Sequence, residues 1–160
     1  MGDIVINVML FFAALALMEG VAWFTHRYIM HGVLWCWHKS HHEPRHSAFE
    51  LNDLFAFWFA LPSIVLIYFG SNGHPYLLSL GLGIAAYGAV YFMFHDGLVH
   101  RRFRVPFNRR RAFWRKRIQA HQMHHAVNSR EGAVSFGFLI VRSPKDLKRE
   151  LIRKKASLRR

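Results

Sequence analysis

Histidine is the residue whose number and spacing in this sequence could support chemistry. The chain has 12 histidines among 160 residues, and ten of them fall into four short elements. Two elements read HxxxxH, and each is followed by an element that reads HxxHH. In the first half of the chain these are His26 with His31, and His38 with His41 and His42. In the second half they are His95 with His100, and His121 with His124 and His125.

Helix geometry predicts how such elements can bind metal. Residues at i, i+3 and i+4 lie on one face of an α-helix, so each HxxHH element is expected to bring three ring nitrogens together. Residues at i and i+5 are about 140° apart on an ideal helix, so the two histidines of an HxxxxH element are not expected to bind one ion side by side. They are expected to reach different ions or to straddle the point where a helix leaves the bilayer.

Two metal ions would share these ten imidazoles at five each, which leaves about one octahedral position on each ion for water or dioxygen. Such an open position is typical of a catalytic site, whereas structural metal sites are closed. Imidazole suits iron, copper, zinc and nickel, so the ligand type alone does not identify the metal. The spacing therefore predicts an enzyme-like dimetal site.

Three carboxylates lie near the predicted ligands. Glu19 is seven residues before His26 inside an apolar stretch, which makes it a functional candidate unless it lies at the solvated interface. Asp53 and Asp96 are expected to accept a ring N–H from a ligand histidine and so to fix its tautomer. Asp53 can equally be a helix cap.

The two remaining histidines have plainer interpretations. His74 lies in the turn at residues 70–75 and is interpreted as a polar anchor at the membrane surface. His46 is four residues beyond His42, but Pro44 interrupts the helix between them, so we expect a surface or supporting role in preference to a ligand.

Apolar helices must position these side chains. Hydrophobic residues make up 52% of the chain and aromatic residues 16%, which is high for a soluble protein of this length. Apolar stretches at residues 4–24, 52–70 and 76–94 approach the roughly 20 residues needed to cross about 30 Å of hydrocarbon. The residues before the first stretch carry no positive charge, so it is expected to be a retained span and not a signal peptide. The single cysteine, Cys36, excludes an internal disulfide.

The placement of charge predicts the orientation. All 22 Lys and Arg lie between Arg27 and Arg45 or after His100, and the formal net charge is +13. Both basic regions are expected on the cytoplasmic side of a cell inner membrane. Spans one and three then carry their HxxxxH elements to that side, in the cytoplasmic segments at residues 25–51 and 95–141.

Two basic segments lie outside the spans. The run of arginines and aromatic residues at 101–117 would suit nucleic acid, but beside a transmembrane helix it is expected to face anionic lipid headgroups, so we predict no nucleic-acid partner. The tail at 142–160 predicts a helix with Ser143 as N-cap and Pro144 as its first residue. We expect that segment to be a solvated surface helix or a frayed end.

The four histidine elements, together with the strings at residues 48–53 and 131–138, resemble the bacterial β-carotene 3-hydroxylases of the membrane-bound fatty acid hydroxylase and sterol desaturase superfamily. The resemblance runs from about Glu19 to Leu139. It implies a non-haem di-iron monooxygenase that uses dioxygen and two electrons to hydroxylate C3 of a β-ionone ring. It also implies a role as iron ligands for His26, His31, His38, His41, His42, His95, His100, His121, His124 and His125.

The sequence thus predicts a single all-α integral membrane domain over residues 1–160, with three to four transmembrane helices and a cytoplasmic-side helical cap. No glycine-rich nucleotide motif is evident, so electrons are expected from an external donor such as ferredoxin with its reductase. Aromatic residues of spans two and three could line a tunnel for a carotenoid from the bilayer. The alternatives are another oxygen-dependent hydroxylase, ketolase or desaturase of lipids or carotenoids, or a histidine-rich metal transporter. Transporters place their sites near the bilayer midplane, whereas these ligands follow the ends of the spans.

Overall fold

The computed structural model describes residues 2–44 and 47–158, and every regular element in those ranges is helical. Three helices are long and apolar enough to cross a membrane. They are α1 (Gly2–Phe24), which continues into the π-helix η1 (Thr25–Val33), α3 (Leu54–Ser71), which follows the 3-10 turn η2 (Leu51–Asp53), and α4 (Pro75–Phe92), which continues into the π-helix η3 (Met93–Val99). The predicted fold class is confirmed.

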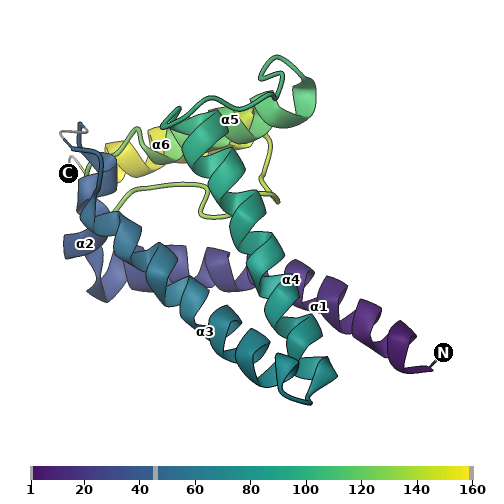
Figure 1. The fold of residues 1–160 in the computed structure, drawn as a ribbon. Helices are drawn as coiled ribbons and strands as arrows, with labels where there is room; N and C mark the ends of the chain where they lie inside the picture. Colours follow the sequence, from purple (N-terminus) through teal and green to yellow (C-terminus); the bar gives the residue numbers. More distant parts are fainter. Residues whose placement is uncertain (1, 45–46, 159–160) are drawn as a thin grey trace.

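Three shorter helices complete the chain: α2 (Trp35–His42), α5 (Ala112–His124) and α6 (Pro144–Ser157). Figure 1 shows α5 and α6 lying together over the ends of the long helices that are remote from the α3–α4 turn. His74 is exposed in that turn, as expected for a polar anchor. His46 lies outside the described residues.

Helix α4 is central, because both α1 and α3 pack along it. Glycines allow these close approaches. A Cβ atom at Gly81 would lie 2.9 Å from the backbone nitrogen of Ile67 in α3, and one at Gly83 would lie 2.4 Å from the carbonyl oxygen of Phe11 in α1. Small residues are common where helices meet in lipid, because close packing and hydrogen bonds hold such helices together. Ser63 adds a hydrogen bond of 2.8 Å to the carbonyl of Gly81.

The C-terminal helix begins as predicted, with the Ser143 side chain accepting from the backbone N–H of Asp146. Most of this helix is exposed, as expected for a surface helix, but one face of it is buried. Leu147 and Leu151, four residues apart on one helix face, are buried in a small core whose other members are Ala120, Val127 and Val134. Because α6 packs beneath α5 and the segment that follows α5, it supports the histidine site.

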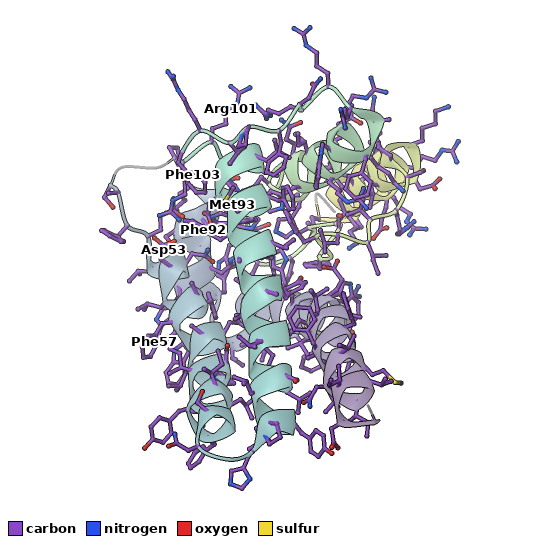
Figure 2. All side chains as sticks on the ribbon, turned by 45° about the vertical axis from the view of Figure 1, so that its right-hand side comes forward. Asp53, Phe57, Phe92, Met93, Arg101 and Phe103 are labelled. Carbon is purple, nitrogen blue, oxygen red and sulfur yellow. The ribbon has the colours of Figure 1, made fainter. Side chains whose placement is uncertain are left out.

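The aromatic residues of the basic segment pack against α4 and η3. Phe103 stacks on Phe92 with ring centroids 4.8 Å apart, and Trp114 stacks on Phe94 at 4.1 Å. Figure 2 shows Phe103 near Phe92 and Met93, and Arg101 at the upper end of the molecule. The segment is therefore anchored at the end of the long helices, and its contact with lipid headgroups stays a prediction.

Candidate metal centre

The first HxxxxH element lies in the π-helix η1, and the second begins in the π-helix η3 and ends at its C-cap, His100. The backbone N–H of Leu34 donates to the carbonyl of Ile29, and that of His100 donates to the carbonyl of His95, each at 2.9 Å. A π-helix joins residues i and i+5, so it brings together the pair that an α-helix would separate. The ring centroids of His26 and His31 are 5.4 Å apart, and those of His95 and His100 are 4.6 Å apart. The prediction that these pairs do not lie side by side is wrong, because it assumed α-helical winding.

The ring nitrogens form two clusters that could each hold a metal ion. His26, His31, His38 and His124 have ligand atoms within 4.8 Å of one another, and so do His41, His100, His121 and His125. The Nε2 atom of His42 lies 3.3 Å from that of His38, so His42 joins the first cluster. The Nε2 atom of His95 lies 3.2 Å from that of His41, so His95 joins the second cluster. All ten histidines are thus accounted for, five in each cluster.

Each HxxHH element divides between the clusters. In the first element His38 and His42 belong to the first cluster, while His41 belongs to the second. The second element mirrors this division, since only its middle histidine, His124, crosses to the other cluster. Neighbouring residues on a helix differ by about 100° in direction, so one element can reach two ions. The expectation of three nitrogens converging on one point is therefore corrected.

The two clusters adjoin each other. The rings of His42 and His125, which belong to different clusters, stack with centroids 4.5 Å apart. Both HxxHH elements therefore lie at the same end of the long helices.

Hydrogen bonds fix the tautomer of every histidine in the first cluster. The Nδ1–H groups of His26, His31, His42 and His124 donate to backbone carbonyls, and that of His38 donates to the side-chain oxygen of Asn52 at 2.7 Å. The four carbonyls belong, in the same order, to Phe136, Arg130, Val127 and Val134, at 2.9 to 3.1 Å. A carbonyl oxygen can only accept, so in the neutral rings the proton is on Nδ1 and the lone pair is on Nε2.

These lone pairs face one another, which is the evidence that the cluster fits a cation. Nε2 of His124 lies 3.0 Å from that of His26 and 3.2 Å from that of His31. None of these three neutral rings carries a proton on Nε2, so no hydrogen bond can join the Nε2 atoms. Two ligands at right angles around an ion, each about 2.1 Å from it, are about 3 Å apart. The first cluster therefore has the donor chemistry and the spacing of a metal site.

Burial keeps the rings neutral, as metal ligands must be. Burial, assisted by the neighbouring His31, lowers the pKa of His42 to about 4. Burial and the nearby His95 lower the pKa of His100 to about 3. The pKa values of His121 and His124 are also far below the ordinary value, chiefly because of burial.

The three predicted carboxylates have different roles. Asp53 binds Arg102 through both carboxylate oxygens at 2.6 Å and accepts from the backbone N–H of Glu50 at 3.0 Å, which completes a capping box at η2. Of its two expected roles, Asp53 therefore has the one at a helix cap. Asp96 accepts from Arg102 at 3.0 Å and lies 3.7 Å from Nδ1 of His95. Together they place Arg102 between η2 and η3.

Glu19 acts on the backbone near the site. Its Oε1 atom accepts the N–H groups of Phe138, Leu139 and Ile140 at 2.9, 2.8 and 2.9 Å. Its Oε2 atom accepts the hydroxyl of Tyr87 at 2.8 Å. Glu19 therefore fastens the segment that follows Phe136, whose carbonyl orients His26.

Sequence reasoning missed the groups that orient the rings. Besides Asn52, the carboxylate of Glu50 accepts from Nδ1 of His41 at 3.1 Å. Both residues belong to the string at 48–53, and the carbonyls of Val134 and Phe136 belong to the string at 131–138. The signal was thus present in the two strings that carried the family resemblance, but a backbone carbonyl has no side-chain signature in a sequence.

Two cavities reach the clusters. An apolar cavity of about 510 Å³ lies among α1, α3 and α4, and it is lined by His26, His95 and His121 at one end and by Ile67 and Ile84 at the other. A polar cavity of about 450 Å³ is lined by His41, His42, His100, His121 and His125, with Glu43, Glu50 and Arg102. The clusters are therefore accessible from apolar surroundings through the first cavity and from polar surroundings through the second.

Part of the aromatic set that could line a tunnel does line a cavity, and the tunnel itself stays a prediction. Phe55, Phe59, Tyr87 and Tyr91 line the apolar cavity. Phe57 and Trp58 are 60% and 55% exposed, and Figure 2 shows Phe57 projecting outward from α3. Phe94 stacks on Trp114.

Comparisons with known proteins place these observations in a family. The family model described as fatty acid hydroxylase matches residues 11–142. A β-carotene hydroxylase of Pseudescherichia vulneris is 50% identical over 142 residues, which are 89% of this chain and 81% of that protein. The β-carotene hydroxylase of Pantoea ananas is 52% identical over 133 residues, or 83% of this chain and 76% of that protein. A chloroplastic β-carotene hydroxylase of Capsicum annuum is 40% identical over 140 residues, 85% of this chain and 43% of the plant protein. No solved structure matches the chain.

Proposed function

Since this chain belongs to the fatty acid hydroxylase family, we propose that it is a β-carotene 3-hydroxylase, which converts β-carotene to β-cryptoxanthin and then to zeaxanthin. The relatives cited above carry the name β-carotene hydroxylase, and the chain spans most of the length of the two bacterial ones. One observation of the structure supports the same activity. An apolar cavity ends at histidines of both clusters, so a hydrocarbon and two metal ions can meet there.

The proposed cofactor is a pair of non-haem iron ions. The first cluster would hold one ion with His26, His31, His38, His42 and His124, and the second would hold the other with His41, His95, His100, His121 and His125. When bound, iron would supply the redox chemistry that an unactivated ring C–H requires; dioxygen, two electrons and two protons are consumed, and the second oxygen atom leaves as water. Zinc has no such redox chemistry.

The protein's own residues orient the ligands and exclude water. Asn52, Glu50 and four backbone carbonyls hold six of the rings in one tautomer with Nε2 directed into the clusters. Phe55, Phe59 and Tyr91 present apolar surface to a substrate ring beside His26 and His95. The ring is thus positioned by shape, as apolar substrates must be.

Electrons would reach the site from the polar cavity. We place that cavity on the cytoplasmic face of the cell inner membrane, where the basic residues are expected by charge placement. An external donor, such as an acidic ferredoxin with its reductase, would be attracted by the formal net charge of +13. Raising the ionic strength should therefore lower the apparent second-order rate with the donor, and a rate insensitive to salt would contradict this attraction.

The function is tested by expressing the chain in cells that accumulate β-carotene and analysing the pigments by chromatography. We expect hydroxylated products and about two iron ions per chain, and we expect His124→Ala to abolish both. His74→Ala is the matched control, because His74 is exposed in the α3–α4 turn and should leave product and iron unchanged. Keto or desaturated products would indicate a different oxygen-dependent enzyme, and unchanged pigment with metal uptake would favour a transporter.

A further inference from the structure

The apolar cavity is open between two helices that do not pack closely on each other. Both α1 and α3 pack along α4, and the cavity lies between them. Met18 and Ala22 of α1 form one wall, and Ala56 and Ala60 of α3 form the other. Ile64, which also lines the cavity, is 60% exposed. A molecule dissolved in lipid could therefore enter sideways, between α1 and α3.

Helix α4 forms the floor of this cleft, and its glycines are of two kinds. At Gly81 and Gly83 an added Cβ would collide with α3 and α1, so helix packing explains them. At Gly88 an added Cβ would meet no atom within 4 Å, and Gly88 lines the cavity. Glycine inside a helix costs about 0.5–1 kcal/mol relative to alanine. Helix packing therefore does not explain a glycine at position 88, whereas a need to keep the cleft free of side chains does.

Gly88 lies on the path from the cleft to the histidines. It is seven residues, or two turns, before His95 on the same face of α4, which is about 10 Å along the axis. Along α3 the lining residues extend from Phe55 to Ile67, about 18 Å at 1.5 Å per residue. A fully extended C40 carotenoid is longer than this, so part of the molecule must remain outside the cavity.

We propose that Gly88 is a specificity-determining residue, which keeps the cleft between α1 and α3 wide enough for the conjugated chain of a carotenoid. In this arrangement, which rests on the proposed function, one ring lies at His26 and His95, the chain passes over Gly88, and the far half extends between α1 and α3 into the lipid. A side chain at position 88 would obstruct the chain but not the ring. The cleft thereby selects long, thin, apolar molecules with a terminal ring.

The test compares Gly88→Leu with Gly20→Leu. Gly20 of α1 is a matched control: both glycines are exposed and an added Cβ at either meets no atom within 4 Å, but Gly20 does not line the cavity. We expect Gly88→Leu to lower kcat/KM for β-carotene about tenfold or more. Its hydroxylation of a β-ionone-ring compound whose chain ends before Gly88 should stay within about twofold of the parent. Gly20→Leu should match the parent with both substrates.

Binding is measured separately from turnover. We expect the metal-free Gly88→Leu protein to retain less β-carotene in detergent than the metal-free parent, as measured by visible absorption. Ala60→Leu, in the wall of the cleft that α3 forms, should have the same effects. If one of the two variants fails to fold, the other still tests the proposal. If the parent hydroxylates β-carotene and folded Gly88→Leu binds and hydroxylates it equally well, the role of Gly88 is refuted while the proposed function stands. If the parent itself is inactive on β-carotene but active on another lipid, the proposed function is wrong.

Discussion

Replacing Glu19 by leucine should release the segment that orients His26. The carboxylate accepts three consecutive backbone N–H groups and one tyrosine hydroxyl, and the residue is only 7% exposed. An unsatisfied buried N–H costs about 1–3 kcal/mol, so three cost on the order of 3–9 kcal/mol if the segment stays in place. The N–H groups of Leu139 and Ile140 are only partly buried, so the lower half of that range is expected.

Detachment of residues 136–140 avoids that penalty, because it exposes their N–H groups to water. We therefore expect this segment to detach in Glu19→Leu. Hydrogen exchange measured by mass spectrometry on the detergent-solubilised protein reports this directly. Exchange in a peptide covering residues 136–142 should rise about a hundredfold or more, since each 1.4 kcal/mol corresponds to a factor of ten. Iron retention against a chelator should fall with it, because the carbonyl of Phe136 no longer orients His26.

Two further variants separate the contributions. Glu19→Gln keeps an oxygen acceptor but loses the charge, which roughly halves the strength of each bond, so its exchange should be intermediate. Tyr87→Phe removes one hydroxyl and should change the exchange of this segment by less than tenfold. Protection of residues 136–140 in Glu19→Leu equal to that of the parent would refute the reasoning.

Three other outcomes are expected. Leu147→Ala should destabilise the protein by about 2–5 kcal/mol in thermal unfolding, because Leu147 is 1% exposed. The control Ile152→Ala, at a residue 60% exposed, should have little effect, and equal effects would contradict the packing of α6. Asn52→Leu should weaken iron binding about 10- to 100-fold in chelator competition because His38 loses its acceptor, and the control Asn72→Leu in the α3–α4 turn should not. The metal-free protein should lose stability as the pH falls below 6.5. Burial lowers the pKa of His42 to about 4 and that of His100 to about 3, so below pH 6.5 the unfolded chain binds more protons than the folded chain. A melting temperature that is constant from pH 7 to pH 5 would count against this.

The apolar stretches and histidine spacing predicted the helical fold and the gathering of the histidines. They failed where local winding decides the outcome. The HxxxxH pairs were placed with α-helical geometry, but π-winding brings His26 beside His31. Nothing in a single sequence signals an i to i+5 hydrogen bond, because that choice depends on the tertiary contacts around the ring.

The remaining errors have a similar origin. The tail was expected to be a solvated surface helix or a frayed end, and most of α6 is exposed, but two leucines on one face, Leu147 and Leu151, are buried in a small core. Asp53 was expected either to accept from a histidine or to cap a helix, and it does the second, but its pairing with Arg102, 49 residues later in the chain, was not foreseen. Which of several nearby partners a carboxylate binds is decided by the folded arrangement and not by spacing along the chain.

The exchange of one histidine between the two HxxHH elements makes the halves of the chain interdependent. His41 crosses to the second cluster and His124 to the first, so neither half by itself contains a complete set of five. With the proposed ligands, iron would act as an inorganic crosslink between residues far apart in sequence, such as His26 and His124, which are 98 positions apart. Cells short of iron would then be expected to degrade the newly made chain instead of storing it, so that iron supply sets the amount of protein as well as its activity.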